Sequence, residues 1–195
     1  MLFRSPKPQT PNPKPQTPNP LCVWDGIGLA IIIMAGNQNF TTVNNPLDLS
    51  KNNSVVTITT NNSIVSISGS NIRLTIQENR GTVYIQGANA MLKINRNFQG
   101  VEIDESGAKV EIDENKKDAT VTISSERANV DIKSNNGSIV LGGSNNEVKF
   151  DINKSSGKIS TFGENCKING NVNKLNQGNA HQQQMDGRFN LQIRS

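Results

Sequence analysis

Apolar and polar residues alternate in short bursts along the middle of this chain, and the bursts recur every nine residues. Written in nines from Pro46, the sequence reads PLDLSKNNS, VVTITTNNS, IVSISGSNI and RLTIQENRG, and the register continues to about Leu175. The second and fourth positions are both apolar in 12 of 14 units, of which two are eleven residues long. Apolar-x-apolar alternation followed by Gly, Asn and Ser is typical of a short strand and a turn.

Strands of three or four residues cannot bury an apolar face alone, so consecutive units must stack to form a continuous core. The pattern therefore predicts an all-β fold, a parallel β-solenoid (β-helix), over residues 46–175. Both eleven-residue units place their extra residues after an Asn, Asn115 or Asn153. Insertions at one edge leave such a stack undisturbed, which supports this register.

The seventh position shows how many units make one coil. In every second unit it is Asn, namely Asn61, Asn79, Asn97, Asn115, Asn135, Asn153 and Asn173. The alternate units carry Gly at the sixth position four times, at Gly69, Gly87, Gly143 and Gly163. We therefore predict about seven coils of 18 residues, each with two short strands and two unlike turns. The Asn side chains should form a hydrogen-bonded ladder along the axis, and the Gly-Ser-Asn residues of the other turn should supply positive φ at low cost.

The V-x-I strands and the alternating Asn-rich turns resemble the Asn/Gly-turn parallel β-solenoids of adhesin-like domains of unknown function. The resemblance implies a scaffold architecture and carries over no functional residue, because functions are grafted onto such folds. Calcium-binding nonapeptide solenoids need GGxGxD at each turn, and here only Gly142-Gly143 matches part of that motif.

The segment Val101–Asn115 contains VEIDE twice, which raises the question of a duplicated carboxylate site. In the eighteen-residue register, Glu102 stacks on Tyr84, whereas Glu111 stacks on Lys93. These two columns belong to opposite faces of a thin solenoid. The two VEIDE copies are therefore expected to lie back to back, where they cannot bind one ligand together.

One place remains where carboxylates could meet, at the first insertion. Asp113, Glu114 and Asp118 flank the inserted lysines there. Clustered carboxylates are the ligands that calcium prefers. The sequence therefore leaves two alternatives for this corner, a calcium site or a solvated charged turn, and it predicts no other metal or cofactor.

Flat β-solenoids with ranks of Thr can order water, so ice binding is a further alternative. Thr57, Thr59 and Thr75 begin such a rank. The column then continues with charged residues, which favours pairing between neighbouring strands: Lys93, Glu111, Asp131 and Lys149.

Composition argues against catalysis and nucleic-acid binding. The net charge is +4, but residues 46–175 hold 15 basic and 14 acidic residues, so no basic stripe marks the repeat. The one histidine, His181, lies in a polar tail, and Cys22 and Cys166 form neither a disulfide framework nor a metal cluster. We predict a protein that is not an enzyme.

The termini differ from the repeat. Residues 1–36 contain KPQTPNP twice in tandem, as a translated seven-nucleotide repeat would read, and then the apolar run Ile27–Ala35. That run is too short to span a membrane. It fits either a signal peptide or a segment upstream of a true start at Met34. Residues 37–45 are expected to cap the solenoid, and residues 176–195 to form a polar tail whose Phe189, Leu191 and Ile193 alternate as in a capping strand.

These observations predict a non-enzymatic structural or surface-interaction scaffold, adhesin-like, with a carbohydrate-binding or ice-binding surface module as the alternative. Its partner would be a protein or glycan surface, and a secreted or cell-surface location is favoured over the cytoplasm. The sequence does not determine the oligomeric state.

Overall fold

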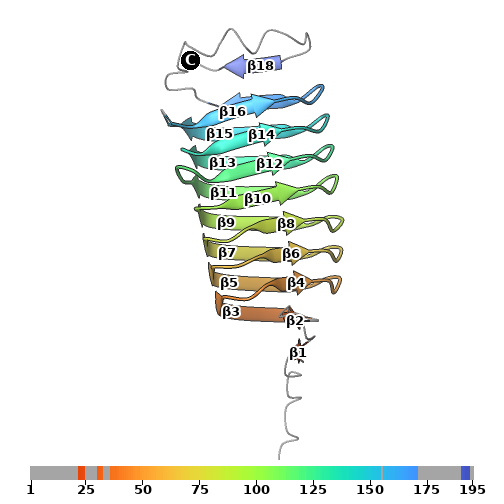
Figure 1. Ribbon diagram of the computed structural model, residues 1–195. Coiled ribbons are helices and arrows are strands. Elements are labelled where there is room, and N and C mark those ends of the chain that lie inside the picture. The colour runs from red at the N-terminus through yellow and green to blue at the C-terminus, as the bar shows by residue number, and fades with distance from the viewer. Residues whose placement is uncertain (1–21, 25–29, 33–35, 155, 171–189, 194–195) are drawn as a thin grey trace, which may run out of the picture.

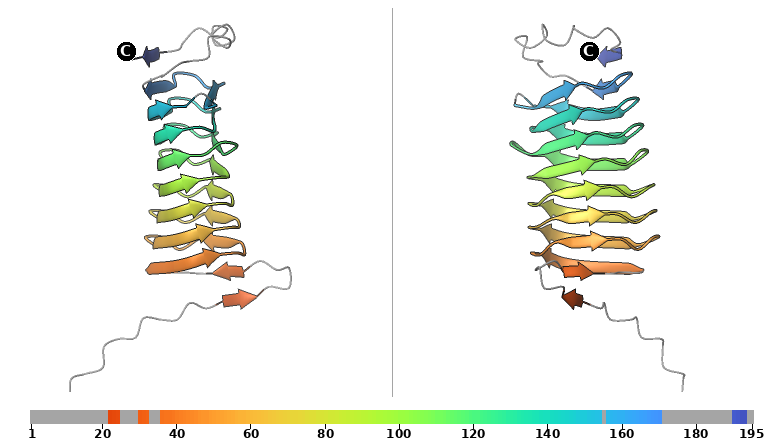
Figure 2. Two further views of the ribbon diagram at one scale, coloured as in Figure 1. Left: turned by 90° about the vertical axis from the view of Figure 1, so that its left-hand side faces the viewer. Right: turned by 45° about the vertical axis from the view of Figure 1, so that its right-hand side comes forward.

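The structure is a computed structural model that describes residues 22–24, 30–32, 36–154, 156–170 and 190–193. It confirms an all-β parallel β-solenoid of about seven coils, about 18 residues apart, with two strands in each coil and no helix in the described ranges (Figure 1). The coils stack along one axis with their turns aligned at the two edges (Figure 2). The predicted fold class and coil length are therefore correct.

Two parallel sheets form the walls of the solenoid. The larger has nine strands in the order β18-β17-β15-β13-β11-β9-β7-β5-β3. Its strands are β3 (Asn37–Val43), β5 (Val55–Asn61), β7 (Arg73–Asn79), β9 (Met91–Asn97), β11 (Lys109–Asn115), β13 (Asn129–Asn135), β15 (Glu147–Asn153), β17 (Lys167–Gly170) and β18 (Asn190–Ile193). Neighbouring strands pair without slippage, so residues one coil apart share a column.

The smaller sheet has seven strands in the order β16-β14-β12-β10-β8-β6-β4. They are β4 (Leu47–Leu49), β6 (Val65–Ile67), β8 (Val83–Ile85), β10 (Gly100–Ile103), β12 (Thr120–Ile123), β14 (Ser138–Leu141) and β16 (Lys158–Thr161). Across the insertion the partners are 20 residues apart, as for Gly100 and Thr120, and the register is kept. The extra residues therefore lie in a turn outside the stack, as predicted.

The ends of the solenoid carry additional strands. Before the first coil, β1 (Cys22–Trp24) and β2 (Ala30–Ile32) form an antiparallel pair, and β2 lies beside β4. At the other end β18 pairs with β17 in parallel. The KPQTPNP repeats, Met34, Asn173, His181 and most of the predicted polar tail lie outside the described residues.

The strands of the larger sheet are longer than the sequence pattern predicts. From β3 to β15 they have seven residues instead of three or four. In β5 the side chains of Val56 and Ile58 point inward, the next two residues both face outward, and Asn61 points inward again. The strand bends at this double outward step without losing its pairing, so the seventh position belongs to the strand instead of the turn.

The core consists of thin layers of short aliphatic side chains. The second and fourth positions of both sheets are buried, and Ile58, Ile76, Ile94 and Ile112 in one column are each at most 1% exposed. A further buried column lies at the ninth position before each long strand, and the sequence pattern did not reveal it. Its members are Ser54, Ile72, Ala90, Ala108, Ala128, Asn146 and Cys166.

The predicted asparagine ladder is present inside the bend. Asn61, Asn79, Asn97, Asn115, Asn135 and Asn153 are buried, and each of the first five donates from Nδ2 to Oδ1 of the next at 2.7–2.9 Å. Asn97 also donates to the carbonyl of Gln99 in its own turn, at 2.9 Å. The stack therefore satisfies buried amides that would each cost about 1–3 kcal/mol if left without a partner.

The Gly-Ser-Asn turn has positive φ, as predicted, and the structure shows which of its positions carries it. Positive φ falls at the eighth position, on Asn53, Asn71, Asn89, Gly107, Arg127, Asn145 and Asn165. Gly69, Gly87, Gly143 and Gly163, at the sixth position, are not in that conformation. They are needed because the coils approach closely there: a Cβ on Gly143 would lie 1.7 Å from the carbonyl oxygen of Ser125.

The last coils depart from the repeat for a steric reason. Gly170 occupies the fourth position, opposite Phe150 of β15. A Cβ on Gly170 would lie 2.3 Å from the ring of Phe150, so the missing side chain makes room for the larger one. Phe162, in contrast, is 81% exposed and adds nothing to the core.

Candidate functional site

The acidic corner at the first insertion separates its three carboxylates. Oδ1 of Asp113 lies 2.6 Å from Nζ of Lys133, one coil further on. Glu114 pairs with Lys116 in its own turn. Asp118 is exposed at the tip of the insertion with a φ of 70°. No group of three or more His, Cys, Asp or Glu side chains in the described part of the chain is arranged to hold a metal ion. Both alternatives for this corner, a calcium site and a solvated charged turn, stay predictions.

The ion pairs of this corner shift two pKa values. The side-chain hydrogen bond from Lys116 lowers the pKa of Glu114, against a smaller opposing effect of burial. The hydrogen bond to Asp113 raises the pKa of Lys133. Both pKa shifts favour the charged forms of Glu114 and Lys133.

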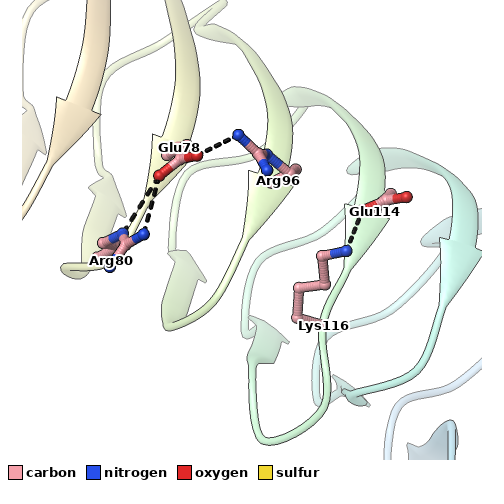
Figure 3. Close-up of polar contacts among 5 residues, drawn as sticks. All are labelled: Glu78, Arg80, Arg96, Glu114 and Lys116. Carbon is pink, nitrogen blue, oxygen red and sulfur yellow. Dashed lines mark hydrogen bonds and ion pairs between the residues drawn. The ribbon is translucent and has the colours of Figure 1, made fainter.

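A second set of charges covers the outside of the ladder bend (Figure 3). Glu78 on β7 accepts from Arg80 at 3.2 Å and from Arg96 on the next long strand. Glu78, Arg96 and Glu114 are neighbours in one column, so the charge alternates from coil to coil. Opposite charges on neighbouring strands stabilise their pairing by roughly a few tenths of a kcal/mol for each exposed pair.

Phe98 lies between two cations in the adjoining column. Arg80 stands 5.4 Å from the centre of its ring and Lys116 stands 6.0 Å away, one coil on either side. Cations at such distances are attracted to the face of an aromatic ring. This stack shields the asparagine ladder, and its cations already have partners. The eighteen-residue spacing of Arg80, Phe98 and Lys116 was the signal for it, and sequence reasoning missed it.

The two VEIDE copies lie on opposite sheets, as predicted. Glu102 on β10 lies beside Tyr84 and Thr122 in the register of the seven-stranded sheet. Glu111 on β11 lies beside Lys93 and Asp131 in the register of the nine-stranded sheet. Nζ of Lys93 lies 3.3 Å from Glu111, which confirms one predicted pair of the charged column, whereas Lys149 pairs with Glu147 on its own strand.

The outward surfaces of the two sheets differ in charge. We call the outward surface of the seven-stranded sheet the short-strand face. Its third-position column contains Asp48, Ser66, Tyr84, Glu102, Thr122 and Val140. The adjacent fifth-position column contains Ser50, Ser68, Gln86, Asp104, Ser124 and Gly142. We call the other surface the long-strand face. No Lys or Arg occurs in β4, β6, β8, β10, β12 or β14. The long-strand face carries both signs, with Lys93, Glu111, Lys133 and Lys149 among its residues.

The Thr rank is broader than the sequence indicated. Thr57 and Thr75 are column neighbours, and so are Thr42 and Thr60. With Thr41 and Thr59 they form an uncharged patch on the first coils of the long-strand face. Thr41 and Thr42 were missed because the register had not been extended to β3, and Thr60 was missed because the sixth position was assigned to the turn.

No protein-family model, curated protein or solved structure matches this chain. The likeness to β-solenoids therefore rests on its architecture. Among the described residues no helix is long and apolar enough to cross a membrane. Cys166 is buried and its thiol donates to the carbonyl of Gly143 at 3.1 Å, which is a structural use of this side chain.

Proposed function

We propose that the protein is a non-enzymatic, adhesin-like scaffold that presents flat polar surfaces to a protein or glycan partner. The observation that carries the proposal is the strict column register of both sheets. Each outward side chain stands beside its counterpart in the next coil, about 4.8 Å away. A contact made by one coil can therefore be repeated by the next, which suits an extended partner.

The interior supports this role because it fixes the surfaces rigidly. Buried Ile and Val layers occupy the inside of each sheet, and the asparagine ladder holds one corner of successive coils at one spacing. Because the backbone of well-packed strands is already ordered, binding does not have to order it, and this part of the entropic cost is avoided. A partner surface with a matching repeat would then gain many weak contacts at once.

The Thr patch supports a second candidate function, ice binding. Thr41, Thr42, Thr57, Thr59, Thr60 and Thr75 present short hydroxyl-bearing side chains in adjacent columns without a charge among them. Such an array can hold ordered water. The patch covers only the first coils, because Lys93 continues its main column.

The test screens the full chain on arrays of glycans and matrix proteins, with an ice-recrystallisation assay in parallel. We expect binding on an array, no ice activity, and array glycans recovered intact by mass spectrometry. If the protein inhibits ice recrystallisation and Thr59→Lys abolishes this inhibition, ice binding by the Thr patch would be the function instead. Release of shortened glycans would contradict the non-enzymatic role.

A further inference from the structure

Four side chains at the centre of the short-strand face form a compact block. Tyr84 on β8 and Glu102 on β10 are column neighbours, and Gln86 and Asp104 follow them in the adjacent column. Neighbouring strands place them about 4.8 Å apart, and two residues along a strand about 6.6 Å apart. Gln86 and Asp104 are exposed, and Tyr84 and Glu102 are half-buried.

None of these four side chains makes a hydrogen bond, ion pair or ring contact with another residue that the structure describes. On the long-strand face, five carboxylates pair with cations, namely Glu78, Glu111, Asp113, Glu114 and Glu147. Asp131 and Asp151 have no ion pair with a described residue there, but their strands also carry Lys133 and Lys149. The short strands from β4 to β14 carry no Lys or Arg, so no cation on these strands neutralises Glu102 and Asp104; the lysine of this sheet, Lys158, lies on β16 at the end of the sheet. A ligand for this block must bring positive charge.

Tyr84 adds a second requirement. It is the one tyrosine of the chain, and its ring stands on the flat sheet between Ser66 and Glu102. The face of an aromatic ring attracts cations and packs against apolar C–H surfaces. The surrounding Gln86, Thr122 and Ser124 supply uncharged hydrogen-bonding groups. The block thus combines an aromatic platform, two free carboxylates and amide or hydroxyl groups.

A sugar ring with a protonated amine fulfils all of these requirements, since it has an apolar C–H face, several hydroxyls and a positive charge. A basic peptide would use the carboxylates but leave the hydroxyl-rich surroundings idle. It also could not bind as an added strand, because β8 is paired on both sides by β6 and β10. On the basis of the scaffold function above, we propose that Tyr84, Gln86, Glu102 and Asp104 form a binding subsite for a glycan of amino sugars.

The test uses isothermal titration of the full chain with a hexamer of unacetylated glucosamine. Tyr84→Ser and Glu102→Thr introduce the residue found one coil away in the same column, so both should fold, as circular dichroism will check. We expect binding that weakens roughly tenfold in Tyr84→Ser, the change that one cation–π contact supplies. Binding should also weaken as salt is added. The matched control is Glu111→Thr, which removes one negative charge from the opposite face and should leave binding unchanged.

Each other outcome overturns the proposal. An unchanged affinity in Tyr84→Ser, or an equal loss in Glu111→Thr, would mean non-specific attraction. Equal binding of the N-acetylated hexamer would remove the role of charge. Hexalysine binding with the same dependence on Tyr84 would assign the block to a basic peptide. If the amino-sugar hexamer does not bind while another array ligand does, the proposed subsite is contradicted and the scaffold function is retained. If no ligand on any array binds, both proposals are contradicted.

Discussion

Asn97 and Asn115 are eighteen residues apart, yet Nδ2 of the first donates to Oδ1 of the second at 2.9 Å in the protein interior. The same bond recurs between buried ladder residues from Asn61 to Asn153, always with the donor nearer the N-terminus. Each amide thus acts as donor to one coil and acceptor to another. Loss of a single member should therefore disturb two neighbours.

We predict that Asn97→Ala lowers the free energy of unfolding by about 3 kcal/mol, since Asn79 loses its acceptor and Asn115 its donor in a buried site. Urea denaturation measures the change. Asn95→Ala, on the outward side of the same strand, is the control and should change stability by less than about 0.5 kcal/mol. Equal effects of the two substitutions would mean that the ladder adds no stability.

Two adjacent glycines allow a sharp test of close approach between coils. Gly143→Ala should destabilise the protein by about 1–3 kcal/mol, because its Cβ would overlap the carbonyl oxygen of Ser125. Gly142→Ala should be nearly neutral, since the nearest atom to its Cβ is 3.5 Å away. Thermal unfolding of both variants checks the pair. A reversed order would contradict the steric explanation.

Arg127 stands in a column where most coils have Asn, with a φ of 56°. Left-handed backbone is unfavourable for a residue such as Arg and tolerated by Asn. Arg127→Asn should therefore stabilise the protein by about 1 kcal/mol and raise Tm by about 2–4 °C. The reciprocal variant Asn145→Arg should lower Tm. A decrease in Arg127→Asn would show that the Arg side chain has a stabilising contact.

The pH dependence of the corner pair follows from the pKa of Glu114, which Lys116 holds below its usual range. The stabilisation from this pair is fully present above the ordinary glutamate pKa and is lost as pH falls through the lowered value. NMR titration should show the low pKa, and Lys116→Asn should move it back toward the ordinary range. Lys93→Thr, which changes a lysine in the separate column of Glu111, should leave the pKa of Glu114 unchanged. An unchanged pKa in Lys116→Asn would assign the shift to other charges.

Calcium should leave the unfolding midpoint unchanged at millimolar concentration. Asp113 and Glu114 already pair with lysines on different sides of the corner, and a ligand must bind the native state to raise Tm. A calorimetric titration measures this. A rise that disappears in Asp118→Asn would instead establish the calcium corner.

Chemical repetition decided which parts of the fold could be predicted from sequence. The Val and Ile of the second and fourth positions and the Asn of the seventh recur with one chemistry, so coil length, sheets and ladder were predictable. The buried ninth position varies from Ser54 through Ile72 to Cys166, because the space there accepts several volumes, and no pattern marks it. The close contact at Gly143 was not predicted, because contact between coils depends on backbone spacing, which a turn motif does not report.

The candidate surfaces were only partly predictable for a related reason. Register alone placed Glu102 beside Tyr84 and separated it from Glu111. Which carboxylates are neutralised depends on side-chain reach: Asp113 meets Lys133 on the next coil, whereas no Lys or Arg occurs on β10, which Asp104 follows, or on the neighbouring strands β8 and β12. That difference singles out the short-strand face, and it could not be read from the net charge.

The eighteen-residue register has a consequence for how such a chain can change in length. Removing residues 73–90 would join Ile72 to Met91, which occupies the same position as Arg73, and Asn61 would meet Asn97 in place of Asn79. Removing nine residues would instead set an asparagine bend on a glycine turn and exchange the two surfaces beyond the cut. The protein thus has a structural reading frame of one coil. Whole coils can be gained or lost while each residue column stays on the same face.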